Sequence, residues 1–124
     1  MHTAGDINRL RSESHRPPPP DFPDAPEGWS LEEARRIAQS AGLSPFEAHW
    51  EVVRALQSYF ARHAGDAGIN MRELHDALDE RFHGIGGMRQ LYQLFPGGPV
   101  AQGCQIAGLK APFLAKDQGF GSVA

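Results

Sequence analysis

Residues 94–109 read LFPGGPVAQGCQIAGL, and they contain both the clearest turn signals and the one cysteine of the sequence. Pro96 ends a helix, because proline lacks a backbone N–H and disfavours the α conformation at the residue before it. Two glycines then permit a sharp turn, and Pro99 suits the first position of a new helix. Gly108 can end that helix in a left-handed cap. We therefore expect Cys104 to lie on a short C-terminal helix that is followed by a tail.

Helix start signals recur upstream of this stretch. In a capping box, a Ser, Thr or Asn side chain and a Glu three residues later each satisfy a free N–H of the first turn. Three such boxes begin at Ser30, Ser44 and Asn70, and apolar residues follow each at helical spacing. The sequence thus predicts five helices, of which the first begins at Ser30, the second runs from Pro45 to about His63, the third ends near His83, the fourth spans Met88 to Phe95 and the fifth carries Cys104.

These elements predict a mainly α fold, since no run of alternating β-branched residues indicates a strand. The third and fourth helices, joined by a glycine-rich turn over 83–87, would form a helix-turn-helix-like element. Residues 1–28 include a run of four prolines and are expected to be a flexible spacer or, less favoured, a proline-rich recognition site. The predicted organisation is a segment over 1–28, a helical domain over 29–109 and a C-terminal tail over 110–124.

The composition excludes several classes of protein. A net charge of −3 and a pI of about 6.0 give no electrostatic footprint for nucleic acid or for an anionic membrane. One cysteine excludes an intramolecular disulfide and a multi-cysteine metal site. The histidines show no zinc-binding pair, so neither a metal nor a cofactor is expected. With no spanning apolar run and no secretory signal, the prediction is a cytoplasmic protein.

Three arginines lie in or beside the helix-turn-helix-like element, namely Arg72, Arg81 and Arg89. They are candidates for contacts with a partner protein or with DNA. An ordinary helical hairpin explains the same pattern, and the net acidity favours that plainer interpretation. DNA binding stays open as the disfavoured alternative.

Cys104 has two interpretations. A lone cysteine in a small helical domain is more often a buried hydrophobe than a nucleophile. Its place near a helix N-terminus would instead favour the thiolate, because the helix field stabilises negative charge there. Cys104 is therefore the candidate reactive thiol, with burial as the alternative.

Two groups of residues resemble the DsrC/TusE family of sulfur-relay proteins. The first reads LYQLFPGGP over 91–99 and CQIAGL over 104–109. The second is Trp29, before the first predicted helix, together with EAHWEV over 47–52. The resemblance runs from about Trp29 to Pro112, and its long LFPxGP and CxxAGL motifs make it specific.

The resemblance implies a small helical fold with an N-terminal β-hairpin and a mobile C-terminal arm that carries sulfur. In the two-cysteine type, the last cysteine pairs with an upstream cysteine in partnership with a dissimilatory sulfite reductase. In the tRNA-thiolation type, the final cysteine alone relays sulfur. The implied role is that of a sulfur carrier rather than of an enzyme that turns over a substrate.

The sequence departs from the family pattern at the end of this arm. Cys104 matches the upstream cysteine, whereas Ala115 occupies the position of the final one. A cycle that needs two thiols on one arm cannot run in this chain alone. Proline-rich sequence also stands where the hairpin would be, which puts the hairpin in doubt because proline removes hydrogen-bond donors of the ladder.

Three functions remain open at this point. The first is sulfur relay, with Cys104 as the only site for a persulfide or mixed disulfide. Its partners would be sulfur-transfer proteins or a dissimilatory sulfite reductase-like enzyme. The second is a non-catalytic regulator that docks to a sulfur enzyme or to DNA, and the third is a structural interaction module with a buried Cys104. The exposure of Cys104 is the observation that separates them.

Overall fold

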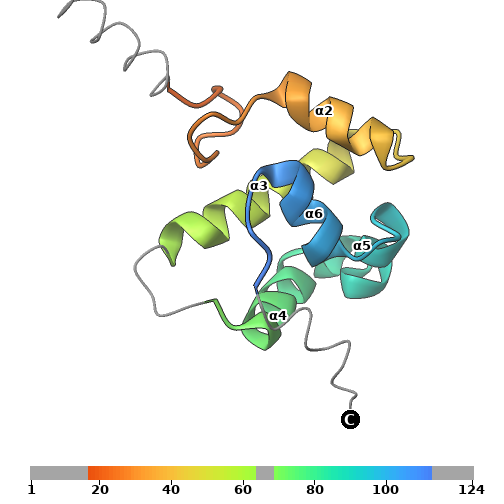
Figure 1. Cartoon of the computed structure of the whole chain (residues 1–124). Helices are drawn as coiled ribbons and strands as arrows, with labels where there is room; N and C mark the ends of the chain where they lie inside the picture. Colours follow the sequence, from red (N-terminus) through yellow and green to blue (C-terminus); the bar gives the residue numbers. More distant parts are fainter. Residues whose placement is uncertain (1–16, 64–68, 113–124) are drawn as a thin grey trace, which may run out of the picture.

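The chain folds as a cluster of short helices (Figure 1). The computed structural model describes residues 17–63 and 69–112. Within these ranges lie α2 (Leu31–Ser40), α3 (Glu47–Arg62), α4 (Met71–Arg81), the 3-10 helix η1 (His83–Ile85), α5 (Gly87–Leu94) and α6 (Pro99–Ala107). These ranges contain no strand, which confirms the mainly α fold class. The predicted tail beyond Pro112, with Ala115, and the first part of the predicted N-terminal segment lie outside the described residues.

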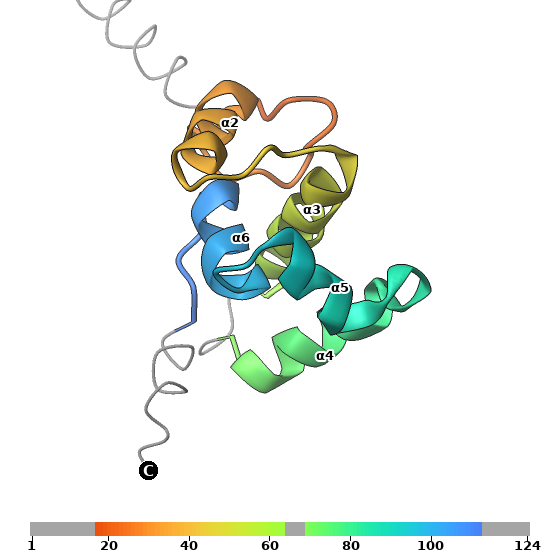
Figure 2. The same ribbon diagram turned by 90° about the vertical axis from the view of Figure 1, so that its right-hand side faces the viewer.

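Helix α6 occupies the middle of this cluster, as Figures 1 and 2 show. It contacts α3, α2 and α5. It packs against α3 at Gly103, where an added Cβ atom would lie 2.8 Å from Cδ1 of Leu56. The absence of a side chain at Gly103 therefore lets the two helices pack tightly. The hydrophobic core to which α6 contributes Val100 and Cys104 also contains buried side chains from neighbouring elements, including Val52, Val53, Leu56, Leu91 and Phe95.

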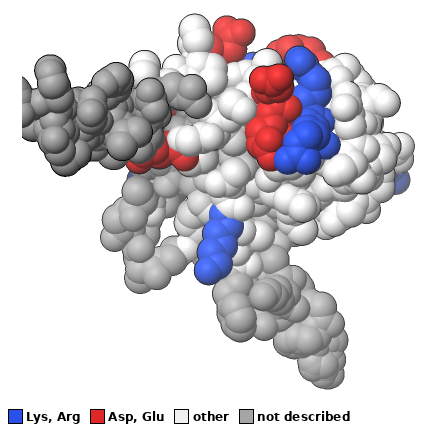
Figure 3. All heavy atoms as spheres, turned by 45° about the horizontal axis from the view of Figure 1, so that its top comes forward, with Lys and Arg blue, Asp and Glu red and all other residues white. Residues whose placement is uncertain are grey.

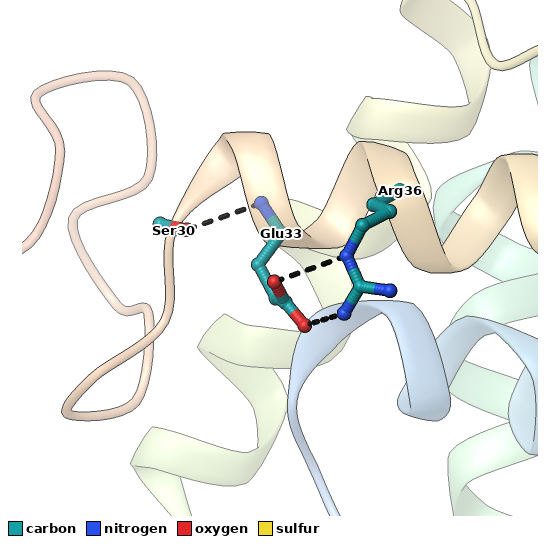
Figure 4. Close-up of polar contacts among 3 residues, drawn as sticks. All are labelled: Ser30, Glu33 and Arg36. Atoms are coloured by element: carbon teal, nitrogen blue, oxygen red, sulfur yellow. Dashed lines mark hydrogen bonds and ion pairs between the residues drawn. The ribbon is translucent and has the colours of Figure 1, made fainter.

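Two of the three predicted capping boxes supply the expected first-turn hydrogen bond. The Ser30 hydroxyl accepts a hydrogen bond from the backbone N–H of Glu33 at 3.1 Å, and Glu33 also pairs with Arg36 on the exposed side of α2 (Figure 4). The Asn70 side chain accepts from the backbone N–H of Glu73 at 3.0 Å and begins α4. These caps depend only on residues three positions apart, which is why the sequence predicts them.

The predicted start of the second helix is wrong by two residues. Helix α3 begins at Glu47, with Phe46 as the capping residue, rather than at Pro45 with Ser44 as the cap. The backbone N–H of Phe46 donates to Nδ1 of His49 at 3.1 Å. The reciprocal partner is therefore a histidine at the third helical position rather than Glu47. This ring is buried, so the contact depends on tertiary packing that a local pattern does not register.

The turn into α5 uses an acidic side chain of α4. The backbone N–H of Met88 donates to Oδ1 of Asp79 at 2.8 Å. Gly87 has a φ of 65°, and an added Cβ there would lie 2.4 Å from the same oxygen. Only glycine therefore fits between Asp79 and the start of α5.

The N-terminal proline-rich segment is not a free spacer over its described part. Phe22 is only 3% exposed and belongs to the hydrophobic core. Its ring lies 4.7 Å from the ring of Trp29 and 6.2 Å from the ring of Trp50, measured between centroids. One large aromatic side chain offsets the lack of backbone hydrogen-bond donors in the prolines and holds the segment on the helices.

Candidate functional site

The candidate site is the helix that carries the single cysteine. Cys104 lies on α6 and is 0% exposed, so its sulfur does not reach solvent. Burial raises the pKa of the Cys104 thiol to about 12. At pH 7 such a thiol is almost entirely protonated. In this conformation Cys104 is therefore a core side chain and not a nucleophile.

The expected stabilisation of the thiolate by the helix field does not occur. Pro99 is the first residue of α6, and Cys104 lies beyond the first turn. The field falls off within that turn, whereas burial in an apolar core disfavours the charged form throughout. Desolvation therefore outweighs the helix dipole at this position.

Two distant side chains hold the C-terminal end of α6. The last carbonyl groups of a helix have no partner within it. The indole N–H of Trp29 donates to the carbonyl oxygen of Ile106 at 2.9 Å. The side-chain amide of Gln57, on α3, donates to the carbonyl oxygen of Ala107 at 3.0 Å. The helix that buries Cys104 is thus fastened to the segment before α2 and to the middle of α3.

A buried histidine holds the chain just before the turn into α6. His49 lies on α3, and its Nε2 is 3.0 Å from the carbonyl oxygen of Leu94. Because Nδ1 accepts from Phe46, this geometry assigns the neutral tautomer with the proton on Nε2. Burial lowers the pKa of His49. Its ring also meets that of Phe95 edge to face, with centroids 5.1 Å apart.

The three candidate arginines do not gather around Cys104. Arg72 and Arg81 lie near opposite ends of α4, about 13 Å apart along the helix axis, and Arg89 lies on α5. All three are exposed. On the face drawn in Figure 3, the visible basic and acidic side chains of the described residues are few and scattered over a largely uncharged surface. A role for these arginines in binding DNA or a partner stays a prediction.

Neither a metal centre nor a membrane span is found within residues 17–63 and 69–112. No group of three His, Cys, Asp or Glu side chains there is arranged to hold a metal ion. No helix of this part of the chain is long and apolar enough to cross a membrane.

Known proteins resemble this chain over most of its length. The family model described as DsrC like protein matches residues 20–114. The chain is 36% identical to the Sulfurtransferase TusE of Yersinia pseudotuberculosis over 85 residues, which is 68% of this chain and 77% of that protein. It is 39% identical to the Sulfurtransferase TusE of Escherichia coli K12 over 85 residues, or 68% and 76% of the two chains. No solved structure matches.

The chain belongs to the DsrC-like family.

The residues that carry the resemblance to the DsrC-like family meet in space. Trp29 bonds to the carbonyl group of Ile106, and His49 bonds to that of Leu94. Both acceptors lie within or at the edge of the 94–109 stretch that contains the family motifs. The sequence motifs include Trp29 and His49 but do not indicate these contacts. Gln57 was missed altogether, because a glutamine within an apolar helix carries no motif.

Proposed function

We propose that this chain functions in sulfur relay by binding the sulfur-transfer proteins of such a system. Two findings support this function. The chain belongs to the DsrC-like family over residues 20–114. It is also 36–39% identical to proteins named Sulfurtransferase TusE. A dissimilatory sulfite reductase-like partner stays a prediction.

The burial of Cys104 carries the choice of role within that function. A persulfide carrier needs a thiolate that can reach the sulfur of its donor. Cys104 is the one cysteine of the sequence, and its thiol is 0% exposed with a pKa raised to about 12. We therefore favour a docking role, in which the chain binds a sulfur-transfer partner without itself holding sulfur in the folded state.

Carriage of sulfur by Cys104 is the second candidate, and it is favoured by the match of this residue to the family's upstream cysteine. The Cys104 thiolate would attack the outer sulfur of a donor persulfide, and the donor would leave as a thiolate. Cys104 would then hold that sulfur as a persulfide, with no net oxidation. This step requires α6 to move away from the core first.

Mass spectrometry after incubation with a small-molecule persulfide separates the two roles. We expect the folded protein to gain no sulfur, while the same chain in urea gains one sulfur atom at Cys104. Binding to a sulfur-transfer partner of a TusE relative should survive Cys104→Ala with a Kd changed by less than about twofold, since a docking surface does not need the thiol. Stoichiometric sulfur uptake by the folded protein would establish carriage instead, and absence of binding would overturn docking.

The DNA alternative has its own test. Arg72, Arg81 and Arg89 are changed together to Ala, and retardation of a DNA fragment is measured at low salt, where phosphate contacts are strongest. Retardation that depends on these arginines would support DNA binding. If the unchanged protein gives no retardation, the DNA alternative is excluded.

A further inference from the structure

The C-terminal end of α6 is held by tertiary contacts in addition to its local cap, in which the backbone N–H of Leu109 donates to the carbonyl oxygen of Cys104 at 2.8 Å. Its last two carbonyl groups accept hydrogen bonds from Trp29 and Gln57, which are 77 and 50 residues away along the chain. Gly108 follows in the left-handed conformation, with φ 78° and ψ 25°. An added Cβ at Gly108 would lie 2.8 Å from Cδ1 of Trp29, so the indole ring covers the end of the helix.

One member of this contact set is incompletely satisfied. Gln57 is only 1% exposed, and its Oε1 has no hydrogen-bond partner among the described residues. A buried acceptor without a partner raises the free energy of the state that contains it. The packed state of α6 is therefore stabilised by the hydrogen bonds that Trp29 and Gln57 donate. It is also destabilised by the unpartnered oxygen of the Gln57 side-chain amide.

The opposite end of α6 is held differently. The backbone N–H of Gly98 donates to the carbonyl oxygen of Phe95 at 2.8 Å, and Phe95 is fully buried. This end is also joined by the chain to α5. The carbonyl oxygen of Leu94, just before this turn, also lies 3.0 Å from Nε2 of His49. If the start of α6 stays packed, exposure of Cys104 requires the other end of the helix to detach at residues 106–108.

We propose that Trp29 and Gln57 form a latch on the C-terminal end of α6, and that opening of this latch controls access to the Cys104 thiol. Opening frees the carbonyl groups of Ile106 and Ala107 and separates α6 from α3. The thiol then meets water, and its pKa returns toward the ordinary range of a cysteine. Regulation of sulfur chemistry by this latch rests on the second candidate under the proposed function, carriage of sulfur by Cys104, whereas the latch itself does not.

The latch is tested by labelling Cys104 in the folded protein with the aromatic disulfide DTNB. The thiolate attacks one sulfur of the reagent, a mixed disulfide forms, and one thionitrobenzoate anion is released and measured by its absorbance. Trp29→Phe removes the indole donor but keeps a ring, and Gln57→Leu removes the amide donor. Trp29→Phe should raise the labelling rate roughly fivefold, the usual effect of one net hydrogen bond on a local opening. Gln57→Leu should raise it by a smaller factor, because it also removes the buried Oε1 that has no partner.

Asn70→Ala is the matched control, because it removes the cap of α4 and lowers global stability without touching α6. We expect its labelling rate to stay within about twofold of the unchanged protein. If Asn70→Ala accelerates labelling as much as the latch variants, or if neither latch variant accelerates it, the latch is overturned. Helical circular dichroism verifies folding, and Gln57→Leu alone decides if Trp29→Phe does not fold. No sulfur donor or partner is used, so this result is separate from the test of the proposed function.

Discussion

The two ends of α6 are held by contacts of different range, although the same nine-residue helix connects them. At its start, Gly98 bonds to Phe95, and the side chain of Gln102 accepts from the backbone N–H of Gly97 at 3.1 Å. At its end, Trp29 and Gln57 reach in from distant parts of the chain. The backbone turns are local at both ends, since the N–H of Leu109 donates to the carbonyl oxygen of Cys104 at 2.8 Å, whereas the side-chain bonds at the end of the helix depend on the assembled fold.

The largest expected effect breaks the packing at the start of α6. Phe95→Ala removes a fully buried ring between His49 and the turn, and it should lower the free energy of unfolding by about 3–5 kcal/mol. Tyr92→Ala is the control, because Tyr92 lies on α5 three residues before Phe95 but is 47% exposed. This variant should cost less than about 1 kcal/mol. Urea denaturation measures both. A loss of less than about 1 kcal/mol for Phe95→Ala would mean that the turn holds without this ring.

A second pair of variants compares the two ends directly. Gly108→Ala places a Cβ on a left-handed residue and 2.8 Å from Trp29, so it should cost about 2 kcal/mol. Gly97→Ala meets only the flexible side chain of Gln102 and should cost less than about 1 kcal/mol. Thermal unfolding of both variants provides the comparison. Equal losses would show that the two ends tolerate a side chain equally and that Trp29 does not crowd Gly108.

A third prediction concerns pH. His49 is neutral in the folded state, and burial lowers its pKa below that of the unfolded chain. The folded state therefore binds fewer protons, so its stability is fully present above about pH 6.5 and is lost as the pH falls through the folded pKa. The free energy of unfolding can change by no more than about 1.4 kcal/mol per pH unit when one proton is involved.

Urea denaturation between pH 7.5 and 5 measures this slope, and His49→Gln should reduce it. The pKa of His75 is also lowered by burial, so His75→Gln is the matched control for the second histidine. If His49→Gln leaves the slope unchanged, the buried ring does not couple protons to folding.

The smallest expected changes in stability come from two capping variants. One removes the cap that the structure shows for α4, and the other removes the cap that the sequence wrongly predicts for α3. Asn70→Ala removes an observed cap and should cost about 1 kcal/mol. Ser44→Ala should change stability by less than about 0.5 kcal/mol, because α3 begins at Glu47 and Ser44 is exposed. A loss near 1 kcal/mol for Ser44→Ala would restore the predicted capping box.

The sequence predicts the helices where the signals lie within a few residues. Asn70 and Pro99 mark the starts of α4 and α6, and Gly108 marks the end of α6, as the structure confirms. The start of α3 is displaced because His49 replaces the expected partner of a local cap. Phe22 was assigned to a spacer because proline content conceals the burial of one aromatic ring.

The sequence predicts only some features of the candidate site. The sequence alone determined that the chain has one thiol, that this thiol lies on a short helix between Pro99 and Gly108, and that the surrounding motifs are those of the DsrC-like family. Capping, turn formation and motif spacing depend on residues a few positions apart, so the sequence alone is enough to predict them.

Only the tertiary structure decided the state of that thiol. The burial of Cys104 and its raised pKa depend on the packing of several helices into one core, and the bonds from Trp29 and Gln57 join segments 77 and 50 residues apart in the chain. Desolvation is set by every atom that surrounds a group, whichever part of the chain supplies it. The helix field that a local pattern suggested is the weaker influence, because it fades within one turn while the core encloses the sulfur on all sides.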